Sequence, residues 1–145
     1  MNRRSSFRQL FQPVGVFTMT LVPALYGAAA PLPLAQAVPA DAAAHTQMMN
    51  DASDAQEDFR FALTDKDQKA AVEALTKLER YMGQTEAYWS AKKQADGVTL
   101  AREARASAAQ SLTAAKANNL EAAKDAFDRM GTTCNSCHDL HLEKR

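Results

Sequence analysis

The amino-acid sequence predicts an all-α fold, an antiparallel four-helix bundle. After residue 37 the chain is rich in alanine, glutamine and charged residues, has few β-branched residues and contains one proline, Pro39. This composition favours helices. Apolar residues there recur every three or four positions, the period of one face of an α-helix. Short polar segments interrupt the pattern, and short connections between amphipathic helices are typical of antiparallel bundles.

The first helix is expected to begin near Asp41, a residue type that caps helix N-termini well. Its acidic residues lie outside its apolar stripe, which consists of His45, Met48, Ala52, Ala55, Phe59 and Ala62. The pattern breaks at Thr64-Asp65-Lys66-Asp67, where either Asp65 or Asp67 caps the next helix. The second helix carries the stripe Ala71, Val72, Leu75, Leu78 and Met82.

Residues 83–98 allow two interpretations. In one, Gly83 and Asp96-Gly97 bound a loop that holds Tyr88 and Trp89; in the other, the second helix continues to Gln94. The third helix is expected from about Thr99 to Ala117, with the weakly apolar stripe Leu100, Ala104, Ala108, Ser111 and Ala115. Asn118-Asn119 then turns the chain, and Asn118 and Glu121 have the spacing of a capping box.

The expected fourth helix carries the residues that point to a chemical function. The only two cysteines of the chain lie in the segment Cys134-Asn135-Ser136-Cys137-His138, and C-x-x-C-H is the attachment signature of c-type haem. Two thiols at this spacing can add to the two vinyl groups on one edge of the porphyrin, and the adjacent imidazole can bind the iron. On a helix, positions i, i+3 and i+4 share one face. The motif continues the apolar stripe Leu120, Ala123, Phe127, Met130, Cys134, Cys137 and His141.

Other interpretations of the motif fit less well. A redox dithiol requires a thioredoxin-like setting of strand and helix, and no strand pattern occurs after residue 40. A disulfide between Cys134 and Cys137 would close a very small loop and add little stability. Zinc would need Cys134, Cys137, His138 and His141 as ligands, but four ligands within eight residues cannot form a tetrahedron.

The N-terminal residues indicate export. Residues 1–37 contain three arginines and no acidic residue, followed by an apolar run from Val14 to Leu34 that three prolines interrupt. The run ends in Ala35-Gln36-Ala37, a small-x-small cleavage site. We therefore expect 1–37 to be a cleaved secretory signal peptide and 38–145 to be one domain in a bacterial periplasm, where haem is attached after translocation.

Charge and composition exclude several classes of function. The leader holds three of the seventeen basic residues and none of the seventeen acidic ones, so residues 38–145 carry a formal net charge of −3. This argues against nucleic-acid binding and against a basic membrane-binding face. No segment of 38–145 is long and apolar enough to span a bilayer. No nucleophile–base pair, paired carboxylate site or phosphate loop is visible, so we do not expect an enzyme.

A four-helix bundle with C-x-x-C-H on its last helix resembles the class II c-type cytochromes, which comprise cytochrome c prime and its low-spin relatives. The resemblance extends over 38–145 in architecture, but only Cys134, Cys137 and His138 match a specific motif. It implies one covalent haem c, with two thioether anchors and His138 as the proximal iron ligand. His141 and Leu142 stand where the family commonly has an aromatic residue and an arginine. Family members often form homodimers through helices 1 and 2, although the exposed residues here show no clear apolar seam.

The distal ligand distinguishes the two functions that the resemblance implies. Cytochrome c prime has a non-ligating apolar residue on helix 1 and binds NO or CO, whereas its low-spin relatives have a methionine there. We expect Met48 to be that ligand, because it shares the stripe of Ala52, Ala55 and Phe59. The alternates are Met49 and His45. Met49 lies on a stripe of the helix that contains more polar residues, and His45 would give a haem with two histidine ligands. We therefore expect a one-electron carrier that serves periplasmic redox partner proteins; the alternative is a five-coordinate NO- or CO-binding protein.

Overall fold

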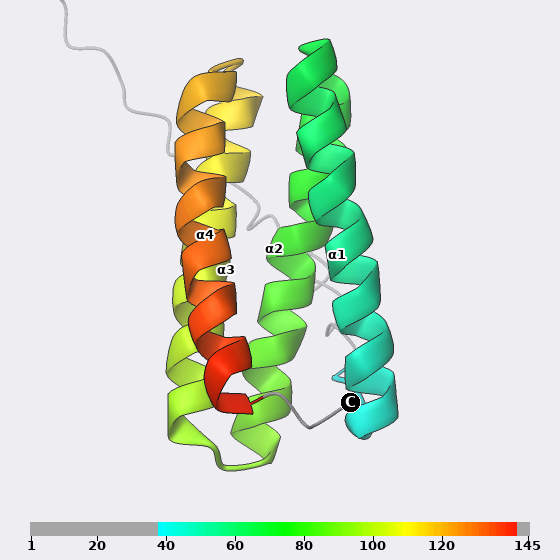
Figure 1. The fold of residues 1–145 in the computed structure, drawn as a ribbon, viewed down its shortest axis with the longest axis vertical. Coiled ribbons are helices and arrows are strands. Elements are labelled where there is room, and N and C mark those ends of the chain that lie inside the picture. Colours follow the sequence, from blue (N-terminus) through cyan, green and yellow to red (C-terminus); the bar gives the residue numbers. More distant parts are fainter. Residues whose placement is uncertain (1–37, 142–145) are drawn as a thin grey trace, which may run out of the picture. The chain divides into compact units, whose positions relative to one another are not determined.

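Four α-helices make up the fold in the computed structural model, which describes residues 38–141 (Figure 1). The described residues contain no strand, which confirms the predicted all-α, four-helix architecture. The predicted signal peptide, 1–37, lies outside the described residues. The helices are α1 (Ala42–Asp65), α2 (Gln68–Ala91), α3 (Ala95–Lys116) and α4 (Leu120–His141).

Side-chain caps begin three of the four helices. The carboxylates of Asp41 and Asp67 accept hydrogen bonds from backbone N–H groups at the starts of α1 and α2, at 2.9 and 3.0 Å. These are the expected positions, and of the two candidates before α2 it is Asp67 that caps. The expected cap Asn118 is wrong, because Asn118 takes a left-handed conformation with φ 57°. The next residue caps α4 instead: the side-chain oxygen of Asn119 accepts from the Ala122 N–H at 3.0 Å.

The helical alternative for residues 83–98 is confirmed. α2 runs without a break through Gly83 and includes Tyr88 and Trp89. It ends at Ala91, three residues before the expected Gln94, and Lys93 with φ 58° turns the chain. α3 then begins at Ala95 rather than near Thr99, so the connection between α2 and α3 is shorter than the sequence predicted.

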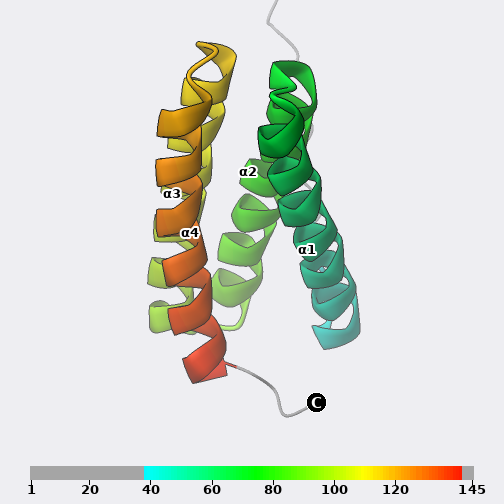
Figure 2. The same ribbon diagram turned by 45° about the horizontal axis from the view of Figure 1, so that its top comes forward.

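Each helix packs against the next helix along the chain, but the first and last helices make little close backbone contact. Close backbone packing joins α1 to α2, α2 to α3 and α3 to α4, and it is nearly absent between α1 and α4. Figures 1 and 2 show the ribbon of α4 in front of that of α3, with α2 between these two helices and α1. α1, which carries the candidate distal ligands, and α4, which carries the C-x-x-C-H motif, are thus not in close backbone contact.

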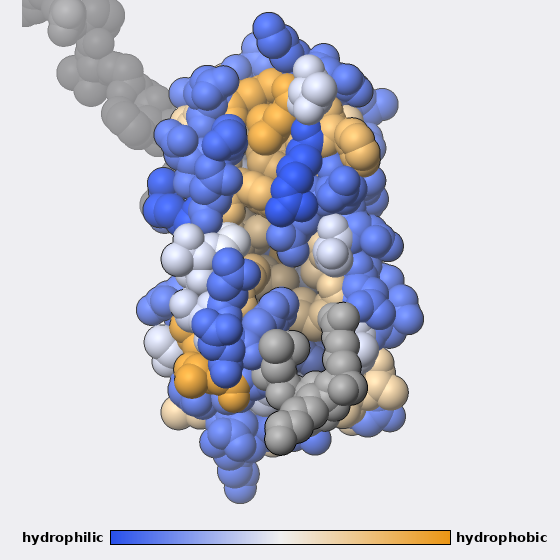
Figure 3. Space-filling model, viewed as in Figure 1, coloured by the Kyte–Doolittle hydropathy of each residue, from blue (hydrophilic) through white to orange (hydrophobic). Residues whose placement is uncertain are grey.

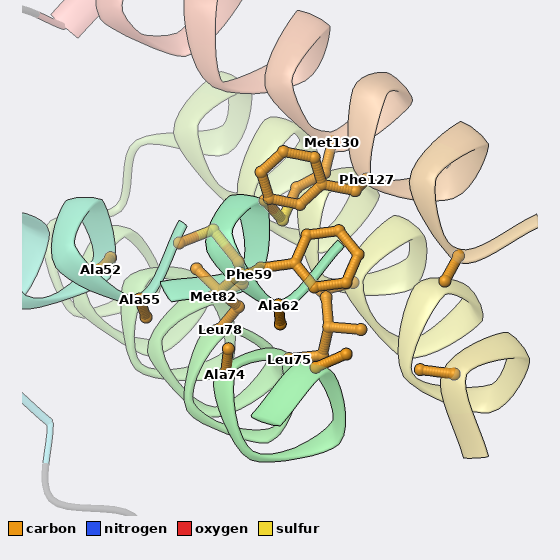
Figure 4. Close-up of a cluster of buried hydrophobic side chains, with 14 of the residues drawn as sticks. Ala52, Ala55, Phe59, Ala62, Ala74, Leu75, Leu78, Met82, Phe127 and Met130 are labelled. Carbon is orange, nitrogen blue, oxygen red and sulfur yellow. The ribbon is translucent and has the colours of Figure 1, made fainter. Parts of the chain in front are cut away.

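The apolar core fills one half of the bundle. Phe59, Leu75, Leu78 and Met130 are fully buried, and the rings of Phe59 on α1 and Phe127 on α4 lie 4.7 Å apart between centroids (Figure 4). This pair joins α1 to α4, whose backbones make little close contact. Toward the start of α1 its buried stripe contains the small residues Ala52 and Ala55. None of the four described helices is both long enough and apolar enough to cross a membrane.

Candidate functional site

A cavity of about 410 Å³ occupies the other half of the bundle. The first half of α1 and the second half of α4 form its facing walls, and α2 and α3 close it from behind. Figure 3, which views the α1 and α4 side, shows atoms of apolar residues set back between hydrophilic side chains in the middle of this face. Small side chains create this space, because Ala52 on α1 and Ala101 and Ala104 on α3 line it where larger residues would fill it.

The cavity lining is mainly apolar. No aspartate, glutamate, lysine or arginine of the described residues lines it. Its polar lining consists of hydroxyl, amide and imidazole groups together with the indole of Trp89 and the phenol of Tyr88. Such a lining suits an apolar group with few polar atoms.

The C-x-x-C-H motif lies on the α4 wall of this cavity. Cys134, Cys137 and His138 all line it, as the helical spacing predicted. Cys134 is half-buried and packs against the core, Cys137 is half-buried, and His138 is exposed. Neither cysteine forms a disulfide. The structure thus brings two thiols and one imidazole to one side of a single cavity.

The surroundings of both cysteines disfavour the thiolate form. Burial, followed by the neighbouring Cys137, raises the pKa of Cys134 to about 11. Burial, followed by the charge of Asp96, also raises the pKa of Cys137. Reactive redox dithiols have a depressed pKa, because the thiolate is the nucleophile. The environment of the two cysteines therefore argues against a redox dithiol.

The facing wall on α1 presents Met49 and His45 rather than Met48. Met49 and His45 line the cavity, whereas Met48 is buried, with 7 % of its surface exposed, and is not among the lining residues. The α1 residues that line the cavity are shifted around the helix by about one residue from its most buried stripe, and the two sets share Ala52.

Rings from three helices gather at the α2–α3 end of the cavity. The His45 ring stacks on Tyr88 with centroids 4.0 Å apart, and the Trp89 ring lies 4.5 Å from that of His141. Nε2 of His141 is 3.2 Å from Oδ2 of Asp96 on α3. Only 12 % of the His141 side chain is exposed. Helical spacing signalled its inward direction, since it continues the stripe of Cys134 and Cys137.

Gly97 makes room for Trp89 in this cluster. A Cβ atom built on Gly97 would lie 2.7 Å from Cγ of Trp89, which is closer than real Cβ atoms approach. Gly97→Ala is therefore expected to displace the indole and to destabilise the fold by about 1–3 kcal/mol, as overpacking does. Urea unfolding would measure this loss. The control is Gly131→Ala, because a Cβ there meets no heavy atom within 4 Å. Equal or higher stability of Gly97→Ala would contradict this role.

No group of three or more histidine, cysteine, aspartate or glutamate side chains in residues 38–141 is arranged to hold a metal ion by itself. Comparison with known proteins adds no assignment: no family model matches this chain, and neither a curated protein nor a solved structure is similar to it.

Proposed function

We propose that this chain is a monohaem c-type cytochrome that carries one electron between redox partner proteins in the periplasm. One observation carries the proposal. The two thiols and the imidazole of a C-x-x-C-H motif line one wall of an apolar cavity, and a methionine and a histidine line the wall that faces it. Thiols for attachment and imidazole or thioether groups for axial ligation are what a c-type haem requires.

The size and lining of the cavity suit this group. Its volume of about 410 Å³ falls within the range of cofactor and small-molecule sites. The absence of aspartate, glutamate, lysine and arginine from the described lining matches the apolar faces of a porphyrin. A bundle core with so many alanines is thin, and a large planar group would supply the apolar volume that the side chains lack.

Each residue of the site has a role in this proposal. Cys134 and Cys137 form the thioether links, and the imidazole of His138 binds the iron from the α4 side. Of the three candidates on α1, the cavity lining favours Met49 as the distal ligand, with Met48 and His45 as the alternates. When bound, the haem supplies one-electron chemistry at the iron, and a methionine–histidine ligand pair raises its potential.

The rest of the chain holds these ligands in place and limits the access of water to the cavity. Core residues such as Phe59 and Phe127 fix α1 against α4 beyond the cavity, so that the two ligand-bearing walls keep their separation. A rigid setting with two fixed axial ligands favours electron transfer, because little has to move when the charge changes. The periplasmic location in this proposal rests on the leader sequence, 1–37.

Absorption spectra of the oxidised and reduced protein, with and without CO, test the proposed function. The carrier is expected to be low-spin in both oxidation states and to bind CO slowly, since CO must displace a ligand held by a packed helix. High-spin spectra with rapid CO binding would favour the five-coordinate NO- or CO-binding protein instead. Protein that contains no haem after expression with a c-type maturation system would reject both functions.

A further inference from the structure

α4 consists of two halves that differ in their tendency to form a helix. In its first half, 120–130, eight of the eleven residues are leucine, alanine, glutamate, lysine, arginine or methionine, which favour helices, and the others are Asp125, Phe127 and Asp128. Every residue from Gly131 to Asp139 is of a type with weak helix propensity: Gly, Thr, Thr, Cys, Asn, Ser, Cys, His and Asp. The second half of α4, 131–141, is called the weak half below. It contains the whole attachment motif, so the helical form of the motif depends on contacts with the rest of the molecule.

The glycine that opens the weak half has no steric purpose. Gly131 has an ordinary helical backbone, since no glycine of the described residues has a positive φ. A Cβ at this position would meet no heavy atom within 4 Å. Alanine therefore fits here, and it would strengthen the helix. The effect of Gly131 is to weaken the helix just before the two cysteines.

Tertiary contacts hold the weak half less firmly than the first half. The buried residues of α4 are Ala123, Ala126, Phe127 and Met130, and all precede Gly131. Polar contacts also tie the first half to α3: the Ser111 hydroxyl donates to the Ala123 carbonyl at 2.7 Å, and Arg129 donates to Gln110 at 3.0 Å.

The hydroxyl groups of the weak half bond within their own helix. Thr132, Thr133 and Ser136 each donate to the carbonyl four residues earlier, at 3.2–3.3 Å, so they add no link to another helix. The polar and ring contacts of this half with α2 and α3 are made at its end, where His141 meets Trp89 and Asp96. A weak helix with few tertiary links opens at low free-energy cost.

We propose that residues 131–141 open from the bundle as a local unit before haem is attached, and that attachment closes this unit as the last turns of α4. This inference rests on the proposed function. Opening presents both thiols away from the core against which Cys134 packs. Each S–H then adds across one vinyl C=C bond: sulfur bonds to one vinyl carbon, the proton goes to the other, and no oxidant or reductant is needed. The bound haem afterwards supplies the contacts that the weak helix lacks.

Hydrogen–deuterium exchange on the full chain purified without haem tests local opening. Amides of 131–141 are expected to exchange at least about tenfold faster than those of 120–130, as a low-cost local opening requires. In the haem-loaded protein both halves should be protected. Equal protection of the two halves without haem would overturn the inference, and so would equal loss of protection, because the opening would then be global.

Gly131→Ala tests whether the weak helix matters for attachment. The variant should lower the equilibrium constant for opening roughly fivefold, the effect expected from Gly to Ala in a helix. Exchange in 131–141 and the rate of haem attachment should both fall by about that factor. The control is Thr113→Ala, which strengthens α3 at an exposed position and should leave both unchanged. Unchanged exchange and attachment in Gly131→Ala would contradict the inference. If no variant takes up haem, the proposed function fails, while the exchange pattern still decides whether the segment opens.

Discussion

Replacing Cys134 and Cys137 together by serine is expected to abolish covalent haem retention completely. In the wild-type protein two thioether bonds would join the porphyrin to α4, and such bonds survive both denaturation and acid–acetone extraction. The double variant keeps the cavity, because serine is smaller than cysteine and both positions lie on the cavity wall. Any haem that it binds should therefore be removed by extraction. Denaturing electrophoresis with haem staining, together with the mass of the intact protein, would measure the difference.

Single variants and a neighbouring control sharpen this test. Cys134→Ser and Cys137→Ser should each weaken attachment and leave at most one thioether. Ser136→Ala is the matched control, because Ser136 is exposed and its hydroxyl donates only to the Thr132 carbonyl of its own helix, at 3.2 Å. It should retain haem fully. His138→Ala should remove the proximal nitrogen from the iron. Wild-type haem that extracts freely would reject the c-type assignment.

Much of the fold could be predicted because periodicity and capping are local properties of the sequence. The stripe from Phe127 through Met130 to Cys134 identified the face of α4 that packs inward, and Asp41 and Asp67 marked two helix starts. The choice between loop and helix around Gly83 stayed open, since an isolated glycine lowers helix propensity without ending a helix. Tertiary packing decided it: Met82, Thr85 and Tyr88 are buried in one continuous stripe of α2.

The position of the C-x-x-C-H residues on one face of α4 could be predicted, whereas the α1 residues that line the cavity could be predicted only in part. The spacing of Cys134, Cys137 and His138 places them on one helical face without any knowledge of the neighbours. On α1 the apolar stripe revealed only which residues are most buried, and these residues meet different neighbours: Phe59 packs against Phe127 of α4, whereas Ala52 lines the cavity. Met49 faces the cavity from the side of that stripe, next to polar residues such as Ser53 and Gln56 that also line it. A sequence pattern reports how buried a residue is, and it does not report which of two neighbouring helices the residue faces.

Met49→Ala is expected to change the iron from low-spin to high-spin and to make CO binding fast. Met49 lines the cavity opposite the helix that carries His138, and alanine has no sulfur with which to replace it as a ligand. The near-infrared charge-transfer band from sulfur to ferric iron should be present in the wild-type protein and lost in the variant. Ferric absorption spectra and stopped-flow CO binding would measure both changes.

Met48→Ala provides the contrast, because it changes the same residue type one position earlier. Met48 is buried outside the cavity lining, so its truncation should cost stability, about 2–5 kcal/mol for a buried methionine, and leave the iron low-spin. The reverse pattern, with high-spin iron only in Met48→Ala, would assign the ligand to Met48 and would require α1 to rotate by about one residue when haem binds. Low-spin iron in both variants, without a charge-transfer band in the wild type, would assign it to His45, since imidazole gives no sulfur band. The electron-carrying function would stand in each of these cases, because all three place a second strong ligand on the iron, and only high-spin wild-type iron would remove it.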